Sequence, residues 1–128
     1  MKAMMQYETI LGQVVSKANN YQAVPDNQGG KRIIKSNAIR QYERAFLSQC
    51  KLYRNKNINR PFILHVDVFE SSRVYDLDNA LKTILDCLQY AKAISNDNLC
   101  IEIHAVKHLD RNNPRISYAI QELEPRIF

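Results

Sequence analysis

The chain has 128 residues, 45 % of them hydrophobic, so we expect one compact domain spanning residues 1–128. Its longest apolar runs, such as residues 62–64, are far shorter than the roughly 18 residues of a membrane span. No apolar stretch typical of a signal peptide follows Met1, so a cytoplasmic protein without membrane association is expected. Three widely spaced cysteines predict neither a disulfide framework nor a zinc site. The net charge of +5 suits a polyanionic partner such as a nucleic acid.

The first half of the chain is expected to contain one strand, one long loop and one helix. Residues 6–15 have an alternation compatible with a strand. Residues 16–32 are rich in Asn, Gly and Lys and contain Pro-Asp and Gly-Gly turn pairs, which predicts a long loop. From Ser36 or Asn37 as the N-cap, apolar residues recur at helical spacing and predict an amphipathic helix to residue 53.

The second half is expected to contain three strands and a second helix. Residues 61–70 alternate as a strand does, and residues 78–94 show helical spacing with Asp78 as a natural N-cap. Residues 99–106 and 115–123 alternate again and are expected to form a hairpin. This order of elements predicts a small α+β domain in which helices pack on one face of a mixed sheet.

An acidic cluster surrounds the expected start of the second helix. Asp76 in extended chain could turn to the same side as Asp78, because alternate residues of a strand share a face. Asp97 lies where the chain returns to the next strand, so we expect the three carboxylates to converge. Carboxylate ligands suit Mg²⁺, with Mn²⁺ as a substitute, rather than zinc. Such an ion supports phosphodiester hydrolysis, and Lys82, one helical turn after Asp78, could place an ammonium against the phosphate.

Each of these residues also has an ordinary structural reading. Asp78 could serve only as a helix cap with an Asp78–Lys82 pair, worth about 1 kcal/mol for the cap and a few tenths for the pair. Asp97 could be a turn residue, and Asp86 a solvated or lysine-paired residue of the helix. The spacing of the carboxylates by itself leaves the metal site and these simpler roles both open.

The order of these motifs resembles the RusA-type Holliday junction resolvases, the crossover junction endodeoxyribonucleases of phage and prophage. The likeness comprises D-x-D-N at residues 76–79, Lys82, Leu85-Asp86 with Leu88, and Asn96-Asp97 before an alternating strand. It extends upstream to LGQVVSKANNY and to the basic stretch ending at Lys35-Ser36. Tyr75 departs from the pattern, because that family is expected to have Arg just before the first Asp.

The resemblance implies a RusA-like fold, a homodimer and a site of known composition. Asp76, Asp78 and Asp97 would be the metal-binding and catalytic triad, and Lys82 the catalytic lysine. Asn79 and Asp86 are expected to orient these ligands from behind. A homodimer suits a four-way DNA junction, because the junction has approximate two-fold symmetry and needs two paired cuts.

Contacts to DNA beyond the metal site are expected from basic segments, since phosphate contacts dominate affinity. The best candidates lie in or beside the predicted loop: Lys17, Asn19, Asn20, Tyr21, Lys31, Arg32 and Lys35. Lys107 and His108 form a second candidate.

The sequence therefore predicts a Mg²⁺-dependent endodeoxyribonuclease that resolves Holliday junctions by paired, symmetric nicks in DNA recombination and repair. One alternative is a metal-dependent nuclease acting on other branched DNA or on RNA. Another is a junction-binding protein without turnover, in which the acidic cluster is structural and only the basic segments matter.

Overall fold

The computed structural model describes residues 5–16 and 21–124. The four expected strands and two expected helices reappear with changed bounds, and the segment expected to be a loop has a different structure. In chain order the elements are β1 (Glu8–Leu11), β2 (Tyr21–Pro25), β3 (Lys31–Lys35), α1 (Asn37–Gln49), β4 (Phe62–Glu70), α2 (Leu77–Tyr90), the short 3₁₀ helix η1 (Asp97–Leu99), β5 (Cys100–Leu109) and β6 (Arg115–Glu122).

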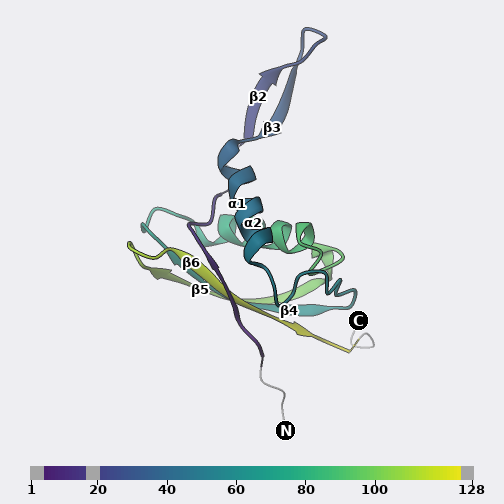
Figure 1. Cartoon of the computed structure of the whole chain (residues 1–128), viewed down its shortest axis with the longest axis vertical. Coiled ribbons are helices and arrows are strands. Elements are labelled where there is room, and N and C mark those ends of the chain that lie inside the picture. Colours follow the sequence, from purple (N-terminus) through teal and green to yellow (C-terminus); the bar gives the residue numbers. More distant parts are fainter. Residues whose placement is uncertain (1–4, 17–20, 125–128) are drawn as a thin grey trace.

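Four of the strands form one mixed sheet in the order β1-β6-β4-β5. β4 runs antiparallel to β6 and parallel to β5, and β6 runs antiparallel to β1. The parallel pair needs a crossover connection, which α2 provides. Figure 1 shows α1 and α2 on the same side of this sheet. The prediction of a small α+β domain with helices on one face of a mixed sheet is confirmed.

The predicted hairpin between the last two strands is wrong. β5 and β6 lie on opposite sides of β4, and β6 is inserted between β4 and β1. The physical reason is burial: β6 buries Tyr118 and Ala119, which face opposite sides of the sheet, whereas every residue of β5 is at least partly exposed. A strand that is covered on both faces belongs in the centre of a sheet, and the more exposed strand lies at its edge.

Part of the predicted loop at residues 16–32 is instead a second structure, the hairpin of β2 and β3. The two strands pair antiparallel in a separate two-stranded sheet. Asp26 closes the connection, since its Oδ1 accepts the backbone N–H groups of Gln28 and Gly30, both at 2.8 Å. Gly29 has φ +82°, a conformation that glycine adopts without strain. Figure 1 shows this hairpin projecting beyond the N-terminal end of α1, away from the four-stranded sheet.

The first helix starts as predicted but ends four residues early. Ser36 is its N-cap, and the hydroxyl oxygen accepts the backbone N–H of Ile39 at 3.4 Å. Beyond α1 the N–H groups of Lys51 and Leu52 donate to the Glu8 carboxylate at 2.8 and 2.7 Å. A distant side chain therefore replaces the helical partners at this end, which the local pattern could not reveal.

The first strand is also shorter than predicted. β1 ends at Leu11, because Gly12 has φ +112° and leaves the strand conformation. Residues 13–16 then have no regular secondary structure.

The core lies between the helices and the sheet. Phe46 of α1 stacks on Tyr118 of β6 with ring centroids 6.0 Å apart, and both side chains are buried. Ile84 and Leu88 of α2 and Leu64 of β4 are also buried in this cluster. In the part of the chain that the structure describes, no helix has the length and apolar character needed to cross a membrane.

Candidate active site

The connection from β4 to α2 positions the first two candidate aspartates. Asp76 has an extended backbone (φ −87°, ψ 133°) and occupies the N-cap position, one residue before the helix. The predicted N-cap, Asp78, is in fact in the first turn, so the prediction for this helix start is wrong by two residues. The helix also ends at Tyr90 rather than at residue 94.

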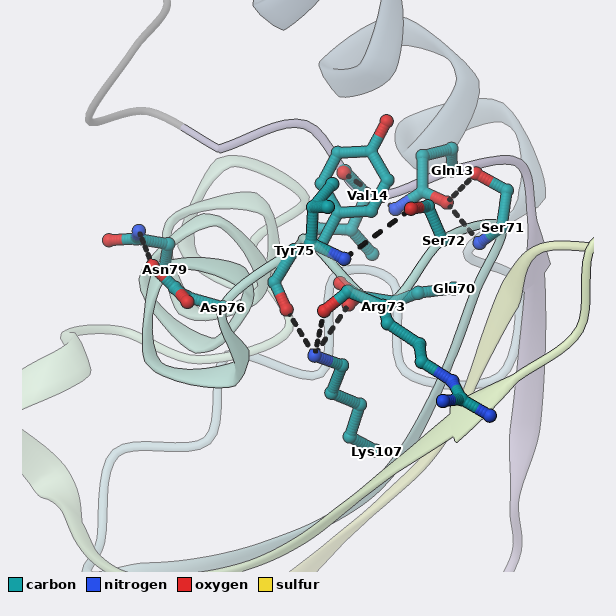
Figure 2. A network of polar contacts seen from close by, with 11 residues as sticks. Gln13, Val14, Glu70, Ser71, Ser72, Arg73, Tyr75, Asp76, Asn79 and Lys107 are labelled. Carbon is teal, nitrogen blue, oxygen red and sulfur yellow. Dashed lines mark hydrogen bonds and ion pairs between the residues drawn. The ribbon is translucent and has the colours of Figure 1, made fainter.

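Both carboxylates remain accessible at the N-terminus of α2. The Asp76 side chain makes no capping hydrogen bond, and both Asp76 and Asp78 are exposed. Oδ2 of Asp76 instead accepts the side-chain amide of Asn79 at 3.5 Å (Figure 2). The partial positive charge of a helix N-terminus stabilises nearby anions, which favours two carboxylates at this position.

Two further candidates follow along α2. Lys82 is exposed and lies one turn beyond Asp78. Asp86 is partly buried and lies one turn further, about 12 Å along the axis from Asp78. Lys82 can therefore reach a phosphate held near the helix start, whereas Asp86 is too distant to contact the same ion directly.

Asp97 lies at the opposite end of this helix from Asp76. Its backbone N–H donates to Oε1 of Gln89, in the last turn of α2, at 3.0 Å. A helix of 14 residues spans about 21 Å, so the two aspartates are separated by roughly that length. The parallel pairing of β4 with β5 also places the two aspartates far apart. Asp97 precedes β5, which starts beside the start of β4, whereas Asp76 follows the end of β4.

The expectation that three carboxylates converge within one chain is therefore wrong. Across residues 5–16 and 21–124, no three His, Cys, Asp or Glu side chains come close enough to hold one ion. Asp76 and Asp78 lie together at the start of α2. Asp97 of the same chain lies near the other end of the helix, too far away to bind the same ion.

An ion pair between a buried glutamate and a partly exposed lysine, which we did not predict from the sequence, lies beneath the loop of residues 71–76. Glu70, the last residue of β4, is only 1 % exposed, and its Oε2 lies 4.0 Å from Nζ of Lys107 on β5. Lys107 also donates to the carbonyl oxygen of Arg73 at 3.0 Å and to that of Tyr75 (Figure 2). Burial raises the pKa of Glu70, while Lys107 opposes that shift and Asp76 adds to it.

The sequence did contain a signal for this pair. Phe62, Leu64, Val66 and Val68 alternate along β4 toward the core, and Glu70 occupies the next position of the same series. A charged residue at a core position of a strand predicts a buried partner.

The loop is also attached to the segment that leads to the hairpin. Oε1 of Gln13 accepts the backbone N–H and the hydroxyl of Ser71 at 2.8 and 2.9 Å. Thr83 of α2 donates to the carbonyl of Val15 at 2.6 Å. The chain before the hairpin is thereby hydrogen-bonded to the β4–α2 connection through Ser71 and to α2 through Thr83.

The proposed DNA-contacting residues fall into three groups. Lys31 and Arg32 are exposed on β3 of the hairpin. Tyr21 and Lys35 lie on the hairpin strands, and their side chains are not described. Lys17, Asn19 and Asn20 lie outside the described residues. The second candidate, Lys107 with His108, makes contacts within the chain. Lys107 donates to the carbonyl of Arg73, and Nε2 of His108 lies 2.8 Å from Oδ1 of Asp67.

Comparison with known families agrees with this arrangement. The family model described as Endodeoxyribonuclease RusA matches residues 12–121, which include β4, α2, β5 and nearly all of β6. The chain belongs to this family. RusA endodeoxyribonucleases hydrolyse phosphodiester bonds of DNA, chemistry for which the family implies a divalent metal ion.

One curated relative is the crossover junction endodeoxyribonuclease RusA of Aquifex aeolicus (strain VF5). It is 32 % identical over 57 residues, which cover 44 % of this chain and 45 % of the relative. The match thus spans less than half the length of that RusA protein.

Proposed function

We propose that this RusA-family chain is a Mg²⁺-dependent endodeoxyribonuclease that resolves four-way DNA junctions by paired symmetric nicks. The observation that supports this most directly is the pair of exposed carboxylates, Asp76 and Asp78, at the N-terminus of α2. They lie on the crossover between two parallel strands, in a chain of endodeoxyribonuclease family.

The chemistry of the donors fits a hard divalent cation. The two aspartates offer carboxylate oxygens that are not used to cap the helix, and no His or Cys belongs to the proposed set. Asp76, Asp78 and Asp97 would hold the ion, and Mn²⁺ could replace Mg²⁺. When bound, the ion supplies a Lewis acid that offsets charge developing on the phosphate oxygens.

The roles of the neighbouring side chains follow from their places on α2. Lys82 directs a positive charge toward a phosphate bound near Asp78 and stabilises the transition state. Asn79 donates to Asp76 and limits the directions in which that carboxylate can point. Asp86 lies too far along the helix to bind the same ion, so its contribution would be to the electrostatic environment of Lys82.

A homodimer would complete the site that one chain leaves divided. Asp97 is about 21 Å from Asp76 along α2, so within one chain the two cannot share an ion. We propose that Asp97 of the partner subunit joins Asp76 and Asp78 in each of two equivalent sites. Two sites related by a two-fold axis match the approximate symmetry of a four-way junction.

The edge strand β5 offers a route to this dimer. It is ten residues long, lies at the end of the sheet and exposes Ile101, Ile103, Val106 and Leu109 to between 38 % and 53 %. A long apolar edge is a template for pairing with another strand. If two copies of β5 paired antiparallel, the start of one would lie beside the end of the other. Asp97 would then move toward the Asp76 end of the partner.

The function is tested by cleavage of a labelled four-way junction, a fork and a linear duplex, with and without Mg²⁺. Wild-type protein is expected to give paired symmetric nicks in the junction only when Mg²⁺ is present. Asp78→Asn is expected to abolish cutting and to leave junction binding intact or tighter, because removing an anion lessens repulsion of phosphate. Glu124→Gln, which removes one exposed negative charge elsewhere, serves as the control.

Other outcomes identify the alternatives. Binding without products would leave a non-catalytic junction-binding protein. Equal cutting of fork, duplex and junction would indicate a general nuclease. Preferential cutting of RNA would indicate that RNA is the substrate. Normal cutting by Asp78→Asn would contradict the metal assignment itself.

The hairpin is proposed to contact the DNA backbone. Lys31 and Arg32 are exposed on β3, and the hairpin to which β3 belongs projects away from the four-stranded sheet (Figure 1). Replacing both with Gln is expected to weaken junction binding and to reduce the slope of log affinity against log salt by about 2, one unit per lost phosphate contact. Binding at several salt concentrations measures this slope. The matched control removes the charges of Arg54 and Lys56, and an equal change there would contradict a specific role for the hairpin.

A further inference from the structure

An apolar residue in place of Glu70 would fill the core without burying a charge, so packing does not account for the ion pair of Glu70 with Lys107. Glu70 follows Phe62, Leu64, Val66 and Val68 on the core side of β4, and it is 1 % exposed. Its Oε2 makes no hydrogen bond in the part of the chain that the structure describes. Burying a carboxylate is costly unless it is paired. The presence of Glu70 at a core position of β4 therefore needs a reason other than packing.

That reason is the placement of Lys107. Lys107 pairs in register with Val68 on the neighbouring strand, so its side chain lies diagonally across from Glu70 on the same face of the sheet. Nζ donates to the carbonyl oxygens of Arg73 and Tyr75, and its remaining side faces Oε2 of Glu70 at 4.0 Å. The negative charge of Glu70 opposes movement of the ammonium into solvent, and only 33 % of the lysine side chain is exposed.

The two carbonyls held by Lys107 belong to the last residues before Asp76. Figure 2 shows the ammonium beneath this stretch of chain, between Tyr75, Arg73 and Glu70. Fixing the carbonyl of Tyr75 fixes the peptide plane that it shares with Asp76, because a peptide unit is planar. Lys107 therefore constrains the direction in which Asp76 leaves the loop and enters α2.

We infer that Lys107 and Glu70 are positioning residues that hold the Arg73–Tyr75 loop so that the Asp76 carboxylate is oriented for a divalent cation. Neither residue contacts the ion or the DNA. Lys107 acts through two main-chain carbonyls, and Glu70 acts through Lys107. The inference rests on the proposed function in one respect, which is that Asp76 is a metal ligand.

The test replaces Lys107 with Met, which keeps most of the side-chain volume and removes the donors. The Mg²⁺ concentration for half-maximal junction cleavage is expected to rise about tenfold or more, as for other groups that orient metal ligands. Binding of Mn²⁺ to the protein without DNA is expected to weaken by a similar factor. Metal-free affinity for the junction is expected to change less than about threefold, because Lys107 contacts no phosphate.

Three companion variants separate positioning from general stability. Lys107→Arg retains donors and charge and is expected to restore part of the metal affinity. Glu70→Gln keeps the shape, removes the charge that retains Lys107, and is expected to shift the Mg²⁺ requirement in the same direction; it replaces Lys107→Met if that variant does not fold. Lys56→Met removes a lysine from the loop after α1 and is expected to leave the Mg²⁺ requirement unchanged.

Two results would overturn the inference. One is an unchanged metal requirement in both Lys107→Met and Glu70→Gln; the other is a lower thermal midpoint with unaltered Mn²⁺ binding, which marks a purely structural pair. Hydrogen exchange of the amides of residues 71–76 distinguishes failure of this inference from failure of the proposed function. If wild-type protein neither cuts DNA nor binds Mn²⁺, the proposed function fails; faster exchange in Lys107→Met would still support loop positioning, and unchanged exchange would reject it.

Discussion

A mixture of Asp76→Asn and Asp97→Asn proteins is expected to cut a four-way junction that neither variant cuts alone. Each proposed site takes Asp76 from one subunit and Asp97 from the other, because α2 separates the two by about 21 Å within a chain. In the mixed dimer both substitutions fall in one site, and the second site is intact. Each variant by itself places a substitution in both sites and is expected to lose about a thousandfold or more in rate.

The measurement is junction nicking after the two variants are co-expressed with different tags and the mixed dimer is purified. Random mixing alone would recover about a quarter of the wild-type sites, since half of the dimers are mixed and each has one intact site. The product is expected to be a single nick rather than a symmetric pair. A mixture of Asp76→Asn with Asp78→Asn is the matched control, because both residues come from the same subunit and no intact site can form.

Recovery in that control, or none in the first mixture while the dimer forms, would contradict a shared site. A protein that remains a monomer at all concentrations would contradict the dimer. Either result would leave the Mg²⁺ test of Asp78→Asn standing, because Asp76 and Asp78 lie together in one chain.

Replacing Lys82 with Met is expected to lower the cleavage rate by about 10²–10³-fold at saturating Mg²⁺. Lys82 is exposed and lies one turn from Asp78, so the reason is loss of a positive charge near the phosphate in the transition state. Single-turnover cleavage and a separate binding titration measure the effect. The junction affinity is expected to change by less than about threefold, since one phosphate contact contributes little to the total.

The control for this variant is Lys92→Met, just beyond the other end of α2. Lys82→Arg, which retains the charge, is expected to recover part of the rate. Cleavage at the normal rate by Lys82→Met would contradict the assignment, and an equal loss of binding and rate would make Lys82 a DNA-binding residue rather than a catalytic one.

The sequence by itself determined the local elements and the first half of the site. Alternation along β4 and apolar spacing along α1 and α2 depend only on residues close together in the sequence. These three elements could therefore be predicted with small errors at their ends. Asp76, Asp78, Asn79 and Lys82 lie within two turns of one another along the chain. Their grouping at the start of α2 follows from helix geometry and needed no distant contact.

The ends of elements were predicted less well, because partners far along the chain decide them. Residues beyond α1 donate to Glu8, and the start of α2 depends on a loop held by Lys107 and Gln13. The β2–β3 hairpin was predicted as a loop because its turn residues outweighed its short strands in the local pattern.

Only the tertiary structure decided which strands are neighbours and where Asp97 lies. Alternation predicts that β5 and β6 are strands but does not specify their partners, and burial of β6 on both faces places it beside β4 in the centre of the sheet. The parallel crossover through α2 then carries Asp97 to the end of the sheet opposite Asp76. Spacing along the sequence records how many residues separate two side chains, whereas the direction of each strand and helix determines how far apart they are in space.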